Sequence, residues 1–316
     1  MFEIVAQMGL IILFGAAWRL FRPGGLEPQL LRKALTDTVY YLLLPALVLS
    51  VLWRAELGND TVHIVVLALL GIGSGLLLGY LSCRWCKRLS APATGALILA
   101  ATFPNATYLG LPVLEVSLGP WARSVAIQYD LFACTPLLFT VGILVARHYG
   151  QVHEHGRKEM LGDARNPLLA LFGIPAVIAA IAAVALNVTE VAMPTLVQGL
   201  LTTLERGVVP LMLFSLGLSL RWSRDQWCLL PYVMPVAAIQ LLLTPAIVLA
   251  AGSALGMDGP MQVAVVIESA MPSMVLGVVL CERFRLDSAL YAAAVTVSTA
   301  LSLVTLPFWF TLLGHA

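Results

Sequence analysis

Two prolines interrupt segments of the sequence that are otherwise apolar, and polar side chains follow each of them. The prolines are Pro104 and Pro272. Proline has no backbone N–H, and its ring displaces the carbonyl four residues earlier, so neither segment can continue as an intact α-helix. Asn105 can donate and accept hydrogen bonds, while Thr107 and Ser273 add hydroxyl groups. These residues predict a binding site for a small ligand. The alternative is a pair of proline kinks packed against neighbouring helices.

Four charged residues lie well inside apolar runs: Asp130, Glu205, Arg206 and Glu268. Each costs about 2.5–3.5 kcal/mol at the centre of a membrane helix, so such residues normally face a cavity or a partner. Glu268 precedes the second proline by one helical turn, and we expect it, with Asp130 and Glu205 as further candidates, to take a proton or Na⁺. Arg206 has the planar fork of donors that holds a carboxylate. The structural alternatives are buried neutral acids and an arginine that neutralises a neighbouring carboxylate.

The composition predicts an all-α integral membrane protein. Of the 316 residues, 60% are hydrophobic and 11% are charged, whereas soluble domains average about 25% charged residues. Apolar runs of spanning length fall near 3–21, 34–53, 62–82, 92–116, 121–147, 167–187, 195–220, 229–255, 260–281 and 287–313. We therefore predict ten transmembrane helices.

The basic residues follow the alternation of the loops. All Lys and Arg residues except Arg54, Arg123 and Arg206 fall in one set of alternate loops or at the helix ends beside them. Cytoplasmic loops carry the Lys/Arg excess. This predicts a multi-pass protein of the cell inner membrane with both termini on the outer, periplasmic side.

The two halves of the chain resemble each other. Residues 44–50 match 209–215, the break at Pro104 with Leu109-Gly110 matches the break at Pro272 with Leu276-Gly277, and residues 135–140 match 306–311. We predict five-helix repeats at 1–147 and 167–316, joined by a cytoplasmic linker at 148–166. An odd number of helices inverts the second repeat, so broken helices 4 and 9 would cross as antiparallel elements. The start of each half-helix carries about +0.5 of a charge, which favours an anion.

Catalytic and metal-binding motifs give no competing prediction. The sequence has no H-E-x-x-H, P-loop or G-x-S-x-G pattern, so we do not expect an enzyme. Cys83 and Cys86 supply only two of the four ligands of a closed zinc site. We expect neither a metal centre nor a cofactor nor a nucleic-acid partner, only coupling to H⁺ or Na⁺.

Three motifs resemble the auxin efflux carrier family of the bile/arsenite/riboflavin transporter superfamily, in its bacterial form. They are Phe103-Pro-Asn-Ala-Thr-Tyr-Leu-Gly-Leu-Pro112, Glu268-Ser-Ala-Met-Pro-Ser273 and residues 297–309. The resemblance implies a fold like that of bile-acid sodium symporters. In it, helices 1, 2, 6 and 7 form a scaffold that also supports a homodimer, and helices 3–5 and 8–10 form a moving transport unit. The second break departs from the family pattern because it has no asparagine and no second proline.

The resemblance also implies a function. Its bacterial members carry organic anions such as malonate, and its plant members export auxin. We therefore expect a secondary active transporter that moves a small organic anion, auxin-like or a dicarboxylate, by elevator-type alternating access within the lipid bilayer. The alternatives are a membrane receptor or sensor that binds a metabolite or lipid without transport, and a channel.

Overall fold

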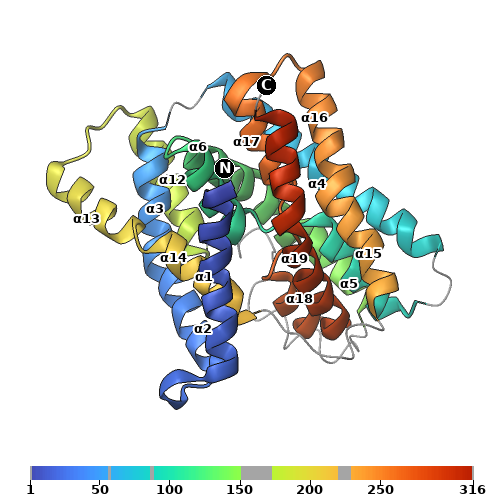
Figure 1. Cartoon of the computed structure of the whole chain (residues 1–316). Helices are drawn as coiled ribbons and strands as arrows, with labels where there is room; N and C mark the ends of the chain where they lie inside the picture. The colour runs from blue at the N-terminus through green and yellow to red at the C-terminus, as the bar shows by residue number, and fades with distance from the viewer. Residues whose placement is uncertain (1, 56–57, 86–88, 151–172, 220–228, 315–316) are drawn as a thin grey trace.

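The computed structural model describes residues 2–55, 58–85, 89–150, 173–219 and 229–314. Within these ranges the chain forms helices and loops, and the only β-type pairing is one isolated bridge. Figure 1 shows the helices as a bundle with both chain ends in its upper half. The predicted linker 148–166 lies almost entirely outside the described residues.

Among the described residues, six helical stretches are long and apolar enough to cross a bilayer. They are Pro28–Trp53, Asn59–Trp85, Ala122–Tyr149, Thr195–Leu218, Leu230–Ala254 and Ser288–Leu313. Shorter apolar helices lie at Gly9–Phe21, Ala91–Thr102, Ala106–Leu118 and Pro175–Val188. The prediction of an all-α integral membrane protein is confirmed.

The helices pack in two groups, which Figure 1 shows side by side. In what we call the flanking group, α1 packs along α14, α14 along α2, and α3 along α12 and α13. Its members are α1 (Phe2–Phe21), α2 (Pro28–Thr38), α3 (Leu44–Trp53), α12 (Pro175–Val188), α13 (Thr195–Glu205) and α14 (Val208–Ser219). A short 3₁₀ turn, η1 (Pro23–Gly25), joins α1 to α2.

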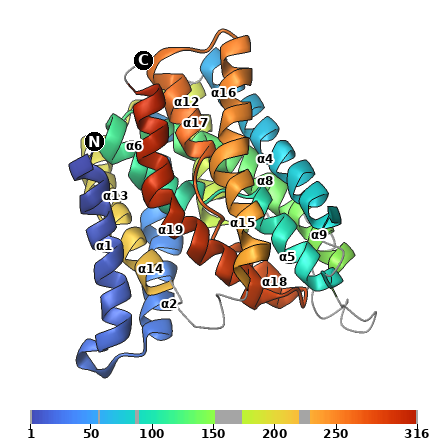
Figure 2. The ribbon, with the colours of Figure 1, turned by 45° about the vertical axis from the view of Figure 1, so that its right-hand side comes forward.

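The second group, the crossing group, holds both interrupted segments. In it α4 packs on α5 and α16, α5 on α9 and α19, and α17 on α7 and α16. Its helices in the first half are α4 (Asn59–Trp85), α5 (Ala91–Thr102), α6 (Leu111–Leu118), α7 (Ala122–Tyr129), α8 (Thr135–Leu137) and α9 (Ile143–Tyr149). Those in the second half are α15 (Leu230–Ala238), α16 (Thr244–Ala254), α17 (Gly259–Ser269), α18 (Gly277–Arg283) and α19 (Ser288–Leu313). Figure 2 shows α15, α17, α18 and α19 together on one side of this group.

Prolines also set the local form of the long helices. Single π-helical turns, η2 (Val39–Leu43), η3 (Ala106–Gly110), η4 (Asp130–Cys134) and η7 (Ile239–Leu243), each end just before a helix that has proline in its first turn. A further π-helical turn is η5 (Leu138–Gly142). Because proline cannot donate and crowds the carbonyl four residues earlier, the widened turn lets the helix continue past it.

Large apolar side chains remain exposed on the outside of the bundle. Val188, Leu196 and Val304 are among the most exposed, at 72%, 83% and 71%. A surface that contacts lipid is expected to expose large apolar side chains. The exposed side chains agree with the membrane location that the composition predicts.

Candidate functional site

The two interrupted segments meet as a short antiparallel crossing. α5 ends at Thr102, α17 ends at Ser269, and Pro104 pairs with Ser273 as an isolated antiparallel bridge. The backbone N–H of Asn105 donates to the Pro272 carbonyl at 2.8 Å, and that of Met274 donates to the Phe103 carbonyl at 2.9 Å. Unwound backbone survives at membrane depth only where protein satisfies it, and here each break satisfies the other.

Side chains fix the second break on both sides. The Ser273 hydroxyl donates to the Ala100 carbonyl at 2.7 Å, and the Ser273 N–H donates to the Ser298 hydroxyl at 3.2 Å. Tyr291, which is buried, donates its hydroxyl to the Met274 carbonyl at 2.8 Å. The serine that follows the second proline therefore has a structural role at the crossing.

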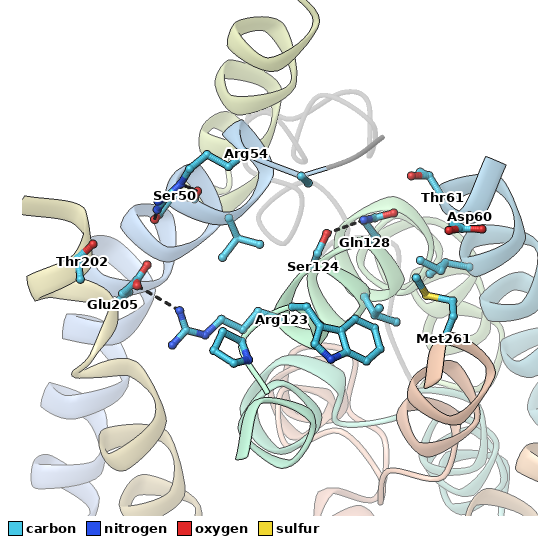
Figure 3. Close-up of a pocket in the computed structure, with 16 residues that line it drawn as sticks. Ser50, Arg54, Asp60, Thr61, Arg123, Ser124, Gln128, Thr202, Glu205 and Met261 are labelled. Carbon is cyan, nitrogen blue, oxygen red and sulfur yellow. Dashed lines mark hydrogen bonds and ion pairs between the residues drawn. The ribbon is translucent and has the colours of Figure 1, made fainter. Parts of the chain in front are cut away.

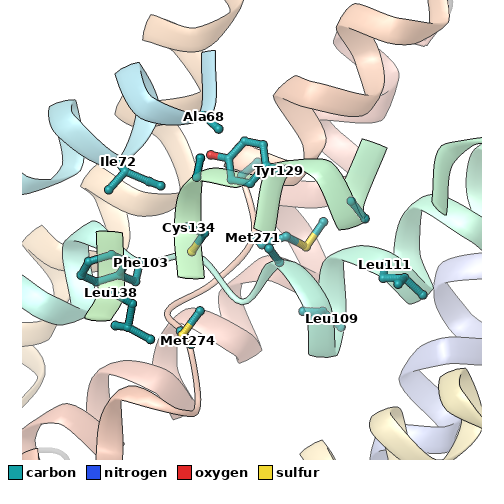
Figure 4. Close-up of a cluster of buried hydrophobic side chains, with 14 of the residues drawn as sticks. Ala68, Ile72, Phe103, Leu109, Leu111, Tyr129, Cys134, Leu138, Met271 and Met274 are labelled. Atoms are coloured by element: carbon teal, nitrogen blue, oxygen red, sulfur yellow. The ribbon is translucent and has the colours of Figure 1, made fainter. Parts of the chain in front are cut away.

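An apolar cluster surrounds the crossing. Figure 4 shows Phe103, Met271 and Met274 from the unwound segments against Ile72, Cys134 and Leu138 of the adjoining helices. Phe103 and Met271 are fully buried. Hydrogen bonds in such low-dielectric surroundings are strengthened, while any unpaired polar group is costly.

Two polar side chains at the crossing nevertheless have no partner among the described residues. Asn105 is 1% exposed, and neither its amide oxygen nor its amide nitrogen is hydrogen-bonded. Glu268 is 0% exposed, and both of its carboxyl oxygens are also unpartnered. A buried polar group without a partner costs about 1–3 kcal/mol, so these two positions mark where a ligand, an ion or a proton is expected to bind.

The π-helical turn η3 connects the first break to both buried acids. The Thr107 hydroxyl donates to the Asp130 carboxyl group, which also accepts from Thr135 at 3.0 Å. At the other end of η3, Gly110 has no side chain, and a methyl group there would collide with the Glu268 carboxyl group. The two acids therefore flank the same turn of the first half-helix.

The starts of the two half-helices differ. In the first, the Asn105 carbonyl accepts from both Leu109 and Gly110, and η3 continues directly into α6. In the second, α18 has only seven residues, and the N–H groups of Val278 and Val279 already donate to backbone carbonyls. The prediction of two positive half-helix ends therefore stays a prediction, and the two half-helices do not start in the same way.

Two cavities approach the crossing from opposite ends of the bundle. The α2–α18 cavity, about 360 Å³, is lined by Arg32, Lys33 and Asp37 of α2, by Tyr108 of η3, and by residues 275–282 around α18. The α3–α7 cavity, about 650 Å³, is lined by the ends of α3 and α13, the start of α4, and α7. Asp37 and Ser50, one from each lining, lie on one helical stretch, and at 1.5 Å per residue they are about 20 Å apart along it.

Each cavity has a polar residue close to the crossing. In the α2–α18 cavity it is Tyr108, which belongs to the same π-helical turn as Thr107. In the α3–α7 cavity it is Gln128, buried and two residues before Asp130. The crossing thus lies between two cavities that have no lining residue in common.

The predicted residues Glu205 and Arg206 lie away from the crossing. Arg206 is exposed at the end of α13 and lines neither cavity. Glu205 lines the α3–α7 cavity, where it accepts a hydrogen bond from Arg123 at 3.1 Å. The structure therefore brings together Pro104, Asn105, Thr107, Asp130, Glu268, Pro272 and Ser273, but not Glu205 or Arg206.

Some polar residues near the crossing were not anticipated from the sequence. Gln240 of η7 donates to the Met271 carbonyl at 3.1 Å, and its amide oxygen has no partner among the described residues. The hydroxyl of Tyr129, also buried, is unpartnered there as well. A glutamine inside the apolar run 229–255 is a visible signal that sequence reasoning had not used.

The fold and the crossing define the class of this protein: a helical integral membrane protein in which two interrupted helices meet beside buried polar groups that have no partner among the residues described. A sequence profile of the family described as "Membrane transport protein" matches residues 1–310. The chain belongs to this family of membrane transporters, and the resemblance to auxin efflux carriers is confirmed.

Two archaeal proteins are similar over nearly their whole length. An uncharacterized transporter of Methanothermobacter thermautotrophicus is 28% identical over 313 residues, covering 97% of this chain and 96% of the relative. An uncharacterized transporter of Methanocaldococcus jannaschii is 24% identical over 314 residues, covering 97% of each. Membership of a transporter family also implies that the chain is not an enzyme.

Proposed function

We propose that this protein is a secondary active transporter that carries a small organic anion, auxin-like or a dicarboxylate, by elevator-type alternating access. The observation that carries the proposal is the crossing, where Asn105 and Glu268, whose polar side-chain atoms have no partner in the described part of the chain, lie between the two cavities. A transporter needs a central site that is reached from one side at a time. A channel needs a continuous path instead.

The start of the first half-helix and two basic side chains near it support an anionic substrate. Arg32 and Lys33 line the α2–α18 cavity, whose inner wall includes Tyr108 at the start of the first half-helix. The acids Asp37 and Glu282 line the same cavity, so its lining is formally neutral, but the two basic side chains can pair with an anion that enters. The start of a helix also favours an anion. Asn105 then supplies both a donor and an acceptor for the bound carboxylate.

Asp130 and Glu268 are our candidates for coupling to H⁺ or Na⁺. Both flank the π-helical turn η3, so protonation or cation binding at either acid would change the contacts of the half-helix that holds the substrate. A ligand shifts a conformational equilibrium only through such differential contacts. Because both acids contact η3, the binding of a proton or cation would provide such differential contacts through this one turn.

The two packing groups support the proposed division of the protein into a scaffold and a moving transport unit. The flanking group consists of the elements that match predicted helices 1, 2, 6 and 7, which we assign as the scaffold. The crossing group would then move as the transport unit, carrying the site with it. Ten membrane crossings in two inverted repeats, and a dimer through the scaffold, complete the proposed architecture.

Uptake into proteoliposomes tests the proposal. We expect Asn105→Ala and Glu268→Gln each to lower the initial rate of organic-anion uptake by at least about tenfold, the loss of one charge-assisted contact. Gln262→Ala is a matched control, because Gln262 lies on the same helix as Glu268 but bonds Ser253 at 2.7 Å, away from the crossing. Unchanged uptake in both site variants would show that the site is assigned wrongly.

The same proteoliposomes and purified protein distinguish a transporter from the two alternatives, a channel and a receptor. Saturable uptake with counterflow of preloaded substrate excludes a channel. Ligand-dependent thermal stabilisation without any uptake would instead favour a receptor.

A further inference from the structure

The α3–α7 cavity contains an ion-pair cluster that the proposed transport site does not use. Arg123 of α7 pairs with Glu115 of α6 and, at 3.1 Å, with Glu205 of α13. Figure 3 shows the Arg123 side chain reaching across the cavity toward Glu205, with Ser50 and Arg54 on the wall above. Glu115 and Arg123 belong to the crossing group, whereas Glu205 belongs to the flanking group.

The cluster is only partly satisfied. Arg123 uses one terminal nitrogen for each carboxylate, and its buried Nε has no partner among the described residues. The second carboxyl oxygen of Glu205 is unpartnered in the same sense. A guanidinium offers five donors in a planar fork and binds a carboxylate best through two parallel bonds. The single bond to Glu205 falls short of that arrangement.

The remaining charges of the lining suit an acidic ligand once Glu205 moves away. The charged residues that line the cavity are Arg54, Asp60, Arg123 and Glu205. Arg54 already donates to Ser50 through two of its nitrogens, at 3.2 and 2.7 Å, which holds it on the α3 wall. Glu115 stays paired with Arg123, so together with the lining residues the charges become neutral when Glu205 leaves. A ligand carboxylate then replaces the negative charge that Glu205 supplied.

We propose that the α3–α7 cavity is an entry site for a carboxylate substrate, in which a ligand carboxylate replaces Glu205 on the Arg123 guanidinium. The exchange keeps Arg123 paired with Glu115 and breaks its ion pair with α13. Arrival of the ligand therefore releases a contact between the two packing groups. This inference rests on the proposed transport function and extends it by naming the residue that first receives the substrate.

Fluorescence of Trp121 provides a local test that does not require transport. Trp121 lines the cavity, and its indole donates to the Leu118 carbonyl at 2.7 Å. Purified full-length protein is titrated with malonate at constant ionic strength, and Trp121→Phe identifies the part of the signal that comes from this side chain. We expect a saturable change whose dissociation constant falls by at least about tenfold in Glu205→Gln and rises by at least about tenfold in Arg123→Gln.

Glu115→Gln is the matched control. It removes the other carboxylate from the same guanidinium but leaves the bond between α7 and α13, so we expect the dissociation constant to change by less than about threefold. The entry-site proposal would be overturned if Glu115→Gln and Glu205→Gln changed the dissociation constant for malonate equally. It would also be overturned if Arg123→Gln left that constant unchanged. If Arg123→Gln does not fold, Arg123→Lys keeps the charge without the fork and is still expected to weaken malonate binding.

The titration and the uptake assay can fail separately. Uptake with no Arg123-dependent titration rejects the entry site and leaves the transporter intact. An Arg123-dependent titration with no uptake of any anion rejects transport and leaves the cavity as a carboxylate-binding site.

Discussion

Gly110→Ala tests whether the contact between η3 and Glu268 matters for function. A Cβ at position 110 would lie 2.5 Å from Glu268 Oε2 and still nearer to Oε1. Ordinary contacts begin near 3.4 Å, so the carboxyl group would have to move by roughly 1 Å. Glu268 is fully buried against the crossing, which leaves it little room to do so.

The cost of such overpacking is about 1–3 kcal/mol. If the native position of Glu268 is required for transport, that cost lowers its population by about 5-fold to 150-fold. We expect the initial rate of organic-anion uptake in proteoliposomes to fall within this range. Glu268→Asp shortens the side chain by about one carbon–carbon bond, about 1.5 Å, so the double variant should recover part of the loss caused by Gly110→Ala.

Gly252→Ala is the control for adding a methyl group to a buried glycine of the crossing group. Its Cβ would meet Gln262 at 3.4 Å, an ordinary contact, and alanine favours the helix by about 0.5–1 kcal/mol. Uptake should therefore be retained. Normal uptake by Gly110→Ala, or strictly additive losses in the double variant, would refute the coupling between η3 and Glu268.

Two further predictions concern stability and are checked by thermal unfolding of the purified protein. Tyr291→Phe leaves the buried Met274 carbonyl without its hydroxyl donor and should destabilise the fold by about 1–3 kcal/mol; an unchanged unfolding midpoint would contradict this role. Asn187→Ala removes an amide that donates to the carbonyls of Leu52, Trp53 and Ala55 at the end of α3, and should cost about 1–2 kcal/mol. Thr189→Ala, at an exposed position of the same helix end, should have little effect, and an equal loss there would argue against the capping role.

The breaks could be predicted because the chemistry of proline is local. Pro104 and Pro272 interrupt a helix wherever they stand within one, and the internal similarity of the two halves indicated that the breaks would meet. The backbone pairing of Asn105 with Pro272 is consistent with that expectation. Asp130 and Glu268 stood out because a charge within an apolar run is expensive.

The surroundings of Arg123, Glu205 and Arg206 could not be predicted, because they depend on how distant helices are rotated. Adjacent residues on a helix point about 100° apart, so either Glu205 or Arg206 was able to face the interior. The structure turns Glu205 toward Arg123, 82 residues earlier, and leaves Arg206 exposed. Arg32 and Lys33 counted in the sequence only as topology signals, whereas they also line a cavity.

The π-helical turns have a consequence for the faces of the long helices. A bond from residue i to i+5 inserts one residue beyond the α-helical period, which rotates every later side chain by about 100°. In Pro28–Trp53, η2 stands between Asp37, which lines the α2–α18 cavity, and Ser50, which lines the α3–α7 cavity. The residues of this helical stretch that line the two cavities therefore lie on faces rotated relative to each other by the π-helical turn. A single helical wheel drawn for the whole stretch cannot represent both faces.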